Sequence, residues 1–221
     1  MLTEQAYIHP IRARIQGMYN DPASRILFWT IAETIPIDMR GSNDYIPEPL
    51  LEDDDWAVWK PIPSSITNAQ IEQLEQECKL QLPLRYRAFL QACHLLDWEL
   101  PNRLTADGYA GGCRSFMFPT LDTAHGLSAV KQMLQEWSVF HDTGYIPFAI
   151  GEDGQGIVCF DTAMLMDNGD CPIVWILLDT LYELPDASAP EDRRALLEKR
   201  MEPIFASFDE MMEAVFENRK H

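Results

Sequence analysis

The residue types of a cysteine nucleophile with its base are present, but their spacing does not define a catalytic site. Cys113 follows two glycines, and the chain offers His125 or His141, with Asp142, as its partners. A thiolate nucleophile needs a neighbouring base, and such residues become adjacent only in the folded chain. Because no family-type signature surrounds Cys113, an inert thiol is the favoured interpretation. We therefore assign no catalytic residue.

Oxygen donors also gather in one short stretch, where Asp167, Asn168 and Asp170 could contribute to a cation site. A calcium loop needs six or more oxygens from alternating positions, closed by a bidentate Glu, and this stretch fails that spacing. No pair of Cys or His residues has the spacing of zinc ligands either. The sequence therefore predicts no metal and no cofactor.

The glycines at 151, 154 and 156 could suggest a phosphate-binding loop. However, Glu152 and Asp153 lie among them, and the residues that follow have the pattern of a strand. Phosphate is bound at helix N-termini by backbone N–H groups, and carboxylates repel it. The glycines instead predict a tight hairpin between two strands, because glycine readily adopts positive φ angles.

The segment from Gln132 to Asp192 is strongly acidic, with twelve Asp and Glu residues and neither Lys nor Arg. The whole chain has a formal net charge of −18. Such a segment creates a negative potential that repels nucleic acid and anionic lipid and attracts basic surfaces. We therefore expect a basic protein partner and no binding to nucleic acid or membranes. The alternative is that the charge only keeps the protein soluble.

Many of these carboxylates fall at one turn and one loop, which makes them candidate contact residues. Charged residues at an interface rim mainly speed association, so neighbouring aromatic residues are expected to supply affinity. The candidate partner-binding residues are Glu152, Asp153, Gln155, Asp161, Asp167 and Asp170, with Trp98, Tyr109 and Tyr182 as aromatic residues in loops. The alternative is that each is an ordinary solvated turn residue.

The composition is that of a globular protein that can bury a core. The chain has 221 residues, of which 47% are hydrophobic, and this length allows one domain with an extension. Its five cysteines include no CxxC pair, so reduced thiols and a cytoplasmic location are expected. The N-terminus has no signal-peptide pattern, and every apolar run is shorter than the ~20 residues that cross a bilayer.

The first 55 residues are predicted to be a helical extension followed by a linker. Apolar residues at helical spacing predict one helix that ends near Met18 and a second over residues 22–31. Prolines and acidic residues predict a linker over residues 36–55. A domain of residues 56–221 would follow, and residues 1–35 are a candidate homodimer contact.

The pattern after residue 56 predicts helices, then strands, then a helix. Thr67 with Gln70 forms a capping box for one helix, and Pro83 begins another. A further helix is expected around residues 127–137. Short runs rich in β-branched and aromatic residues predict strands after Gly144. These runs are 145–150, 156–160 and 173–178. Ser207 with Glu210 caps a last helix, so the predicted fold class is α+β, with a mostly antiparallel central sheet flanked by helices.

Three stretches carry a family pattern through their order and spacing. They are ITNAQIEQLEQECKLQLPLRYRAFL from Ile66, PFAIGEDGQGIVCFD from Pro147 and IFASFDEMMEAVF from Ile204. Together they resemble the SUKH superfamily, specifically its Smi/Knr branch, over roughly residues 56 to 217. The chain departs from that pattern where the family usually has a Gly before Leu-Pro and an Asn-Gly-type turn after the second helix. Residues 1–55 lie outside the resemblance.

The resemblance implies a compact α+β domain that acts by binding and not by catalysis. In bacteria such domains serve widely as immunity proteins that neutralise a cognate toxin of a contact-dependent or polymorphic toxin system. Many such toxins are nucleases with basic surfaces, so an acidic inhibitor would complement them. The alternative function is a regulatory or scaffolding interaction module of the same fold, without a toxin partner.

Overall fold

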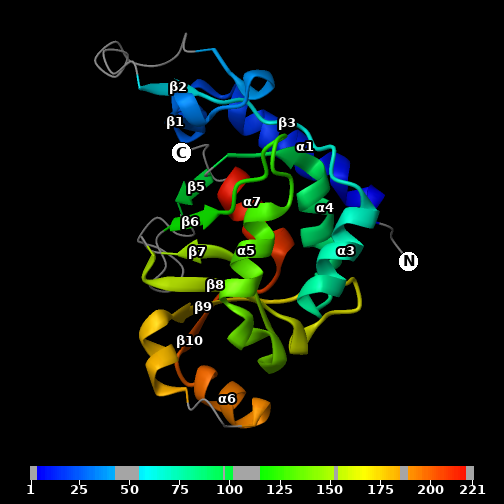
Figure 1. Cartoon of the computed structure of the whole chain (residues 1–221), viewed down its shortest axis with the longest axis vertical. Helices are drawn as coiled ribbons and strands as arrows, with labels where there is room; N and C mark the ends of the chain where they lie inside the picture. The colour runs from blue at the N-terminus through cyan, green and yellow to red at the C-terminus, as the bar shows by residue number, and fades with distance from the viewer. Residues whose placement is uncertain are drawn as a thin grey trace.

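The computed structural model describes residues 4–42, 55–96, 98–101, 115–151, 154–184 and 189–217. Within these residues the largest sheet has six antiparallel strands in the order β10-β9-β8-β7-β6-β5 (Figure 1). The strands are β5 (Trp98–Pro101), β6 (Ser115–Phe118), β7 (Tyr145–Gly151), β8 (Gly156–Asp161), β9 (Ile173–Leu177) and β10 (Met201–Phe205). The predicted α+β class and antiparallel sheet are confirmed.

Helices and two small sheets surround this sheet. The α-helices are α1 (Gln5–Asn20), α3 (Asn68–Cys78), α4 (Leu84–Ala92), α5 (Ser128–Glu136), α6 (Pro190–Leu197) and α7 (Phe208–Glu217). The 3-10 helices are η1 (Pro22–Phe28), η2 (Ala32–Thr34), η3 (Ile37–Met39), η4 (Ser138–Thr143), η6 (Thr162–Met164) and η7 (Leu178–Glu183). The small sheets pair β1 (Trp29–Ile31) with β2 (Trp56–Val58) and β3 (Ile62–Pro63) with β4 (Cys93–His94).

The central strands are buried on both faces, which explains why their sequences are continuously apolar. In β8, Val158 and Phe160 face the main core, whereas Ile157 and Cys159 face a second, smaller cluster. Side chains alternate between faces along a strand, so only a sheet covered on both sides buries all four. The helices α1, α3, α4, α5 and α7 contribute to the main core, and α6 adds Leu197 to the smaller cluster.

The predicted capping boxes mark real helix starts. The Thr67 hydroxyl accepts a hydrogen bond from the Gln70 backbone N–H, and the Gln70 side chain accepts one from the Thr67 backbone N–H. At α7, the Ser207 hydroxyl accepts from the Glu210 N–H, and the Glu210 carboxylate reaches back to the Ala206 N–H. These bonds satisfy backbone donors that no helical carbonyl can reach.

The N-terminal segment packs into the main core. The apolar stripe of α1 is buried, and α1 lies against α4 and α7. The centre of the Phe28 ring lies 4.9 Å from that of Trp59 and 5.4 Å from that of Trp98, and the rings are tilted against one another. A homodimer contact through residues 1–35 would therefore have to use side chains other than this stripe. The division at residue 55 stays a prediction about sequence organisation, since the two parts share one core.

The prediction of a second helix over residues 22–31 is wrong. Its first part is the 3-10 helix η1, and its last three residues form strand β1, which pairs with β2. Trp29, Thr30 and Ile31 are aromatic and β-branched, types that suit a strand once a partner is available. That partner, β2, lies on the far side of the predicted linker. Residues 43–54 of that linker lie outside the described residues.

Gly156 occupies a position where only hydrogen fits. A Cβ placed there would lie 2.0 Å from Trp175 Nε1 and 2.9 Å from the Ile176 carbonyl oxygen. The indole is almost fully buried and the carbonyl is backbone, so neither can withdraw easily.

We expect Gly156→Ala to lower the free energy of unfolding by about 2 kcal/mol, as overpacking of a core does. Chemical denaturation would measure this loss. Gly154→Ala is the control for replacing a glycine without a steric clash, because a Cβ there meets nothing within 4 Å. Its positive φ is expected to cost less stability than the clash at Gly156. A loss at Gly156 no larger than the Gly154 loss would contradict the close approach.

Candidate protein-binding site

The loop that follows β8 is held at both of its ends. At its start, the Thr162 hydroxyl donates to the Gly144 carbonyl oxygen at 2.8 Å. At its end, the Asp170 carboxylate is fully buried and accepts from the backbone N–H groups of Cys171, Phe208 and Asp209 at 2.8, 3.1 and 3.2 Å. Because the last two donors open α7, the Asp170 carboxylate caps this helix from 38 residues away, in addition to the Ser207 hydroxyl.

We call the segment between these two ends the 162–170 loop. It presents apolar side chains to solvent. Met164 and Leu165 are 60% and 59% exposed, and Asp167 is also exposed. Gly169 has φ +77°, and its N–H donates to the Met166 carbonyl oxygen, which closes the turn. Exposed neighbouring apolar side chains on an anchored loop are typical of an interaction surface.

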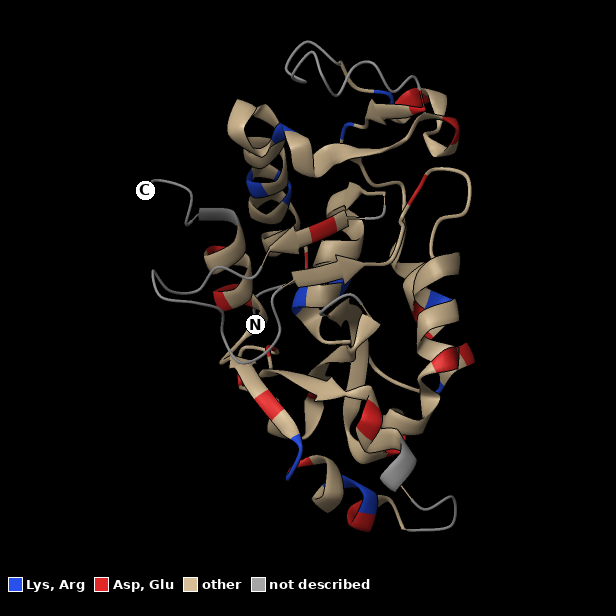
Figure 2. Cartoon of the chain, turned by 90° about the vertical axis from the view of Figure 1, so that its left-hand side faces the viewer, with Lys and Arg blue, Asp and Glu red and all other residues tan. Residues whose placement is uncertain are grey.

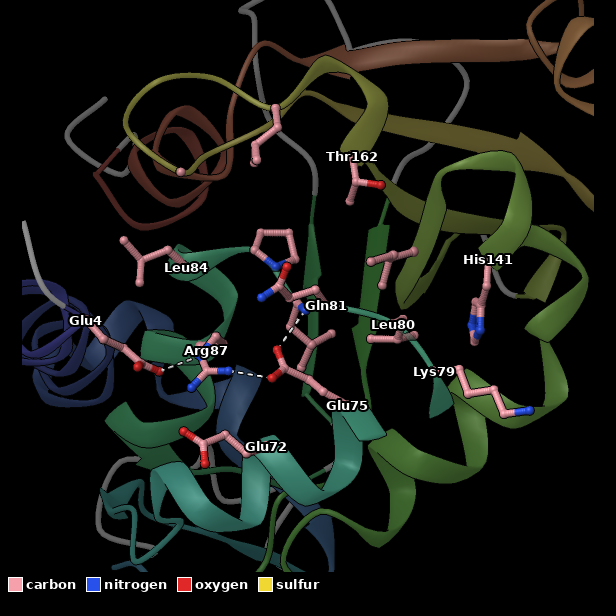
Figure 3. A pocket seen from close by; sticks show the side chains of 15 residues that line it. Glu4, Glu72, Glu75, Lys79, Leu80, Gln81, Leu84, Arg87, His141 and Thr162 are labelled. Atoms are coloured by element: carbon pink, nitrogen blue, oxygen red, sulfur yellow. Dashed lines mark hydrogen bonds and ion pairs between the residues drawn. The ribbon is translucent and has the colours of Figure 1, made fainter. Parts of the chain in front are cut away.

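A groove of about 780 Å³ lies beside the 162–170 loop (Figure 3). Its walls come from α3, the connection to α4, the start of α4, η4 and the loop itself. Leu80, Leu84, Ile146 and Leu165 contribute apolar surface. This volume falls in the range of natural ligand and side-chain pockets.

One end of the groove is built around Arg87. Its guanidinium donates from Nη1 to Glu75 at 2.6 Å and from Nε to Glu4 at 3.2 Å. The other Glu75 oxygen accepts from the Leu82 N–H at 2.8 Å, so this carboxylate also fixes the chain between α3 and α4. Glu72 lies at the same end and is exposed (Figure 3). The network ties α1, α3 and α4 together across the groove.

The opposite end of the groove carries Lys79 and His141 (Figure 3). Burial lowers the pKa of His141 below its ordinary value, so the ring is neutral at pH 7. Its Nε2 is buried with no hydrogen-bond partner among the described residues. Lys79 is exposed and lies in the left-handed conformation that ends α3, with φ 55°. The ends of the groove therefore differ in charge.

Comparison with known proteins gives one match. A model of the SMI1/KNR4 family (SUKH-1) matches residues 65–214, which is well over half of the chain. The chain belongs to the SMI1/KNR4 family. The resemblance of the three sequence stretches is thereby confirmed. Neither the curated proteins nor the solved structures provided a significant match.

In this SMI1/KNR4 member, two of the predicted contact residues are structural. Asp161 is buried and accepts from Arg194 Nη2 with both oxygens, at 3.0 and 2.9 Å. Asp170 caps α7, as described above. Their expected place on a solvated surface is therefore wrong, because each carboxylate has found its donors inside the fold. Asp167 and Gln155 are exposed and remain available to a partner.

Of the three aromatic residues predicted to contact a partner, the structure describes only the Trp98 side chain. Trp98 was expected in a loop, but it lies in strand β5 and is fully buried against Phe28 and Trp59. An indole of this size gains more from core burial than from exposure, which explains the error. Tyr182 belongs to η7, and its side chain lies outside the described part of the structure. Tyr109, Glu152 and Asp153 also lie outside the described residues.

Two carboxylates of the acidic segment are paired with arginines of α6. Arg194 of α6 pairs with Asp161, and Arg193 pairs with Asp142 of η4. Figure 2 shows acidic residues on elements spread over the molecule, with basic residues among them. A single continuous acidic face therefore stays a prediction, and the part of it that involves Asp161 and Asp142 is neutralised.

The alternative chemistries find no support in the described part of the chain. The Nδ1 atom of His125 lies 2.8 Å from the Asp122 carboxylate, a local contact between residues three apart, and Cys113 lies outside the described residues. Among the described residues, no cluster of three or more His, Cys, Asp or Glu is arranged to hold a metal. No described helix has both the length and the apolar character needed to cross a membrane.

Sequence reasoning missed the residues that build the groove. One signal was available, since Glu75 lies four residues after Ile71 and one after Leu74, on the inward stripe of α3. A carboxylate on an apolar stripe needs a buried partner, and here Arg87 supplies it. Glu4 carried no comparable signal, because its contact with Arg87 spans 83 residues.

Proposed function

We propose that the protein is an immunity-type binding protein that neutralises a cognate bacterial toxin in the cytoplasm. Membership of the SMI1/KNR4 family is the observation that carries this proposal, because the family resemblance implies toxin immunity. Such a protein acts by occupying a surface of the toxin, so it needs a binding face and no catalytic group. The proposed binding face is the 162–170 loop with the adjoining groove.

The loop has the properties that favour a protein interface. Met164 and Leu165 are large, adjacent and exposed, and Met adapts its shape to irregular surfaces. Asp167, which is exposed on this loop, would add a negative charge at the rim that speeds association with a basic toxin. The hydrogen bond of Thr162 and the buried carboxylate of Asp170 hold the ends of the loop, which limits the entropy that the loop would lose on binding.

Isolation of the partner tests this proposal directly. The full chain would be used as bait in the native cell at moderate salt, and the captured protein would then be expressed alone and together with the bait. We expect a single basic protein that stops growth alone and becomes harmless when the bait is present. Capture of several non-toxic cellular proteins would favour the scaffolding alternative instead.

The loop itself makes a separate prediction. We expect the double substitution Met164→Ser, Leu165→Ser to weaken the toxin complex about tenfold or more, because apolar side chains buried at an interface centre contribute most of the affinity. Titration calorimetry would measure the dissociation constant. Ile37→Ser is the matched control, since Ile37 is 81% exposed in η3, away from the groove lining. Equal effects of the two variants would place the interface elsewhere.

A further inference from the structure

We propose that the groove beside the 162–170 loop binds a basic side chain, Arg or Lys, next to an apolar residue of the partner protein. This inference rests on the proposed function and names the chemistry that the site would recognise. The observations that carry it are the arrangement of charges in the groove and the apolar surface between its two ends.

The charge at the Arg87 end favours a cation. Arg87 offers one positive charge to Glu4 and Glu75, and both carboxylates contact it. Glu72 adds a third carboxylate at this end, and it has no partner among the described residues. Three carboxylates against one guanidinium leave an excess of about two negative charges, which attracts a cationic group and repels an anionic one.

An anion near Arg87 would meet unfavourable surroundings. The guanidinium already donates to carboxylates on two sides, and an incoming carboxylate or phosphate would lie beside Glu72 as well. Lys79 is the one other described basic residue in the groove lining, but it lies at the far end with the neutral His141 (Figure 3). The groove therefore has a direction, with its cation-binding end at Glu72.

The apolar lining suits the stem of a long basic side chain and a neighbouring residue. Leu80 and Leu84 are half-buried, and Ile146 forms part of the floor. Leu165 is exposed on the 162–170 loop and lines the groove, so its side chain can contact an apolar group placed there. Lys and Arg bury their methylene stems on such surfaces while the charged head stays near carboxylates and water.

A pair of small probes tests this chemistry without the toxin. The full chain, labelled with ¹⁵N, would be titrated with acetyl-leucyl-arginine amide and separately with acetyl-leucyl-citrulline amide, which has nearly the same shape and no charge. We expect saturable shifts of backbone amide signals from Leu80, Leu82, Leu84 and Gly169 with the arginine probe only. Equal shifts with the citrulline probe, or shifts confined to other residues, would overturn the proposal.

Two variants sharpen the result. We expect Glu72→Gln to weaken binding of the arginine probe roughly two- to fivefold, the range for one exposed ion pair. Glu136→Gln, which removes an exposed carboxylate from α5 outside the groove, is the matched control and should leave binding unchanged. Equal weakening by both variants would show non-specific attraction to an acidic protein and would also overturn the proposal.

The outcomes separate this inference from the proposed function. Amide shifts of the groove that change with protein concentration, without any probe, would show that a second copy of the chain fills it, against the proposal. Failure of probe binding with growth rescue intact would remove the groove chemistry and leave toxin neutralisation standing. Probe binding without growth rescue would support the groove as a site for basic side chains and would contradict toxin neutralisation.

Discussion

Asp170→Ala is expected to lower the free energy of unfolding by about 3 kcal/mol, because it removes a carboxylate that caps α7 and leaves buried N–H groups unpaired. The carboxylate is fully buried and accepts from three backbone donors, two of which open α7. Water cannot replace it without entering the core. For a chain of this size the melting temperature should fall by roughly 6–12 °C.

The neighbouring carboxylate in the same loop is the control. Asp167 is exposed, so Asp167→Ala should change stability by less than about 0.5 kcal/mol. Both variants would be compared by urea denaturation followed by tryptophan fluorescence. Similar stabilities for the two variants would show that Asp170 does not cap α7. The same pair tests whether Asp170 is buried, because a solvated carboxylate would behave like Asp167.

The second large effect concerns α6, and we expect Arg194→Met to cost about 2–3 kcal/mol of stability. Its guanidinium donates to both oxygens of Asp161, to the Thr143 carbonyl oxygen at 2.9 Å, and lies 4.7 Å from the centre of the Tyr145 ring. The substitution would leave the buried Asp161 without its cation, the situation that makes broken ion pairs costly. Arg194 is partly exposed, so the expected loss is below that of a fully buried pair.

The adjacent arginine offers a close comparison. Arg193 pairs with Asp142, whose side chain is about half exposed, so Arg193→Met should cost no more than about 1 kcal/mol. The double variant Asp161→Leu, Arg194→Met should lose at least about 1 kcal/mol less than the sum of its two single variants, because both charges leave together. Chemical denaturation of the two single variants and the double variant would measure these losses. Additive losses would contradict a direct ion pair between Asp161 and Arg194.

Several elements followed from the sequence because their causes are local. The capping box at Thr67, the glycines of the β7–β8 hairpin and the apolar runs of β8 and β9 act within a few residues, and the structure confirms these elements. Strand β1 was missed because its partner lies beyond residue 55. A three-residue strand has no local signal strong enough to outweigh a helical pattern.

The sequence by itself determined the fold class, the family pattern and the acidity of the segment between Gln132 and Asp192. Only the tertiary structure decided which carboxylates are free. Asp161 is neutralised by Arg194, 33 residues away, and Asp170 accepts from the Phe208 N–H, 38 residues away, whereas Asp167, only three residues before Asp170, is exposed. The physical reason is that burial and hydrogen bonding depend on neighbours in space, and the composition of a segment carries no information about those neighbours.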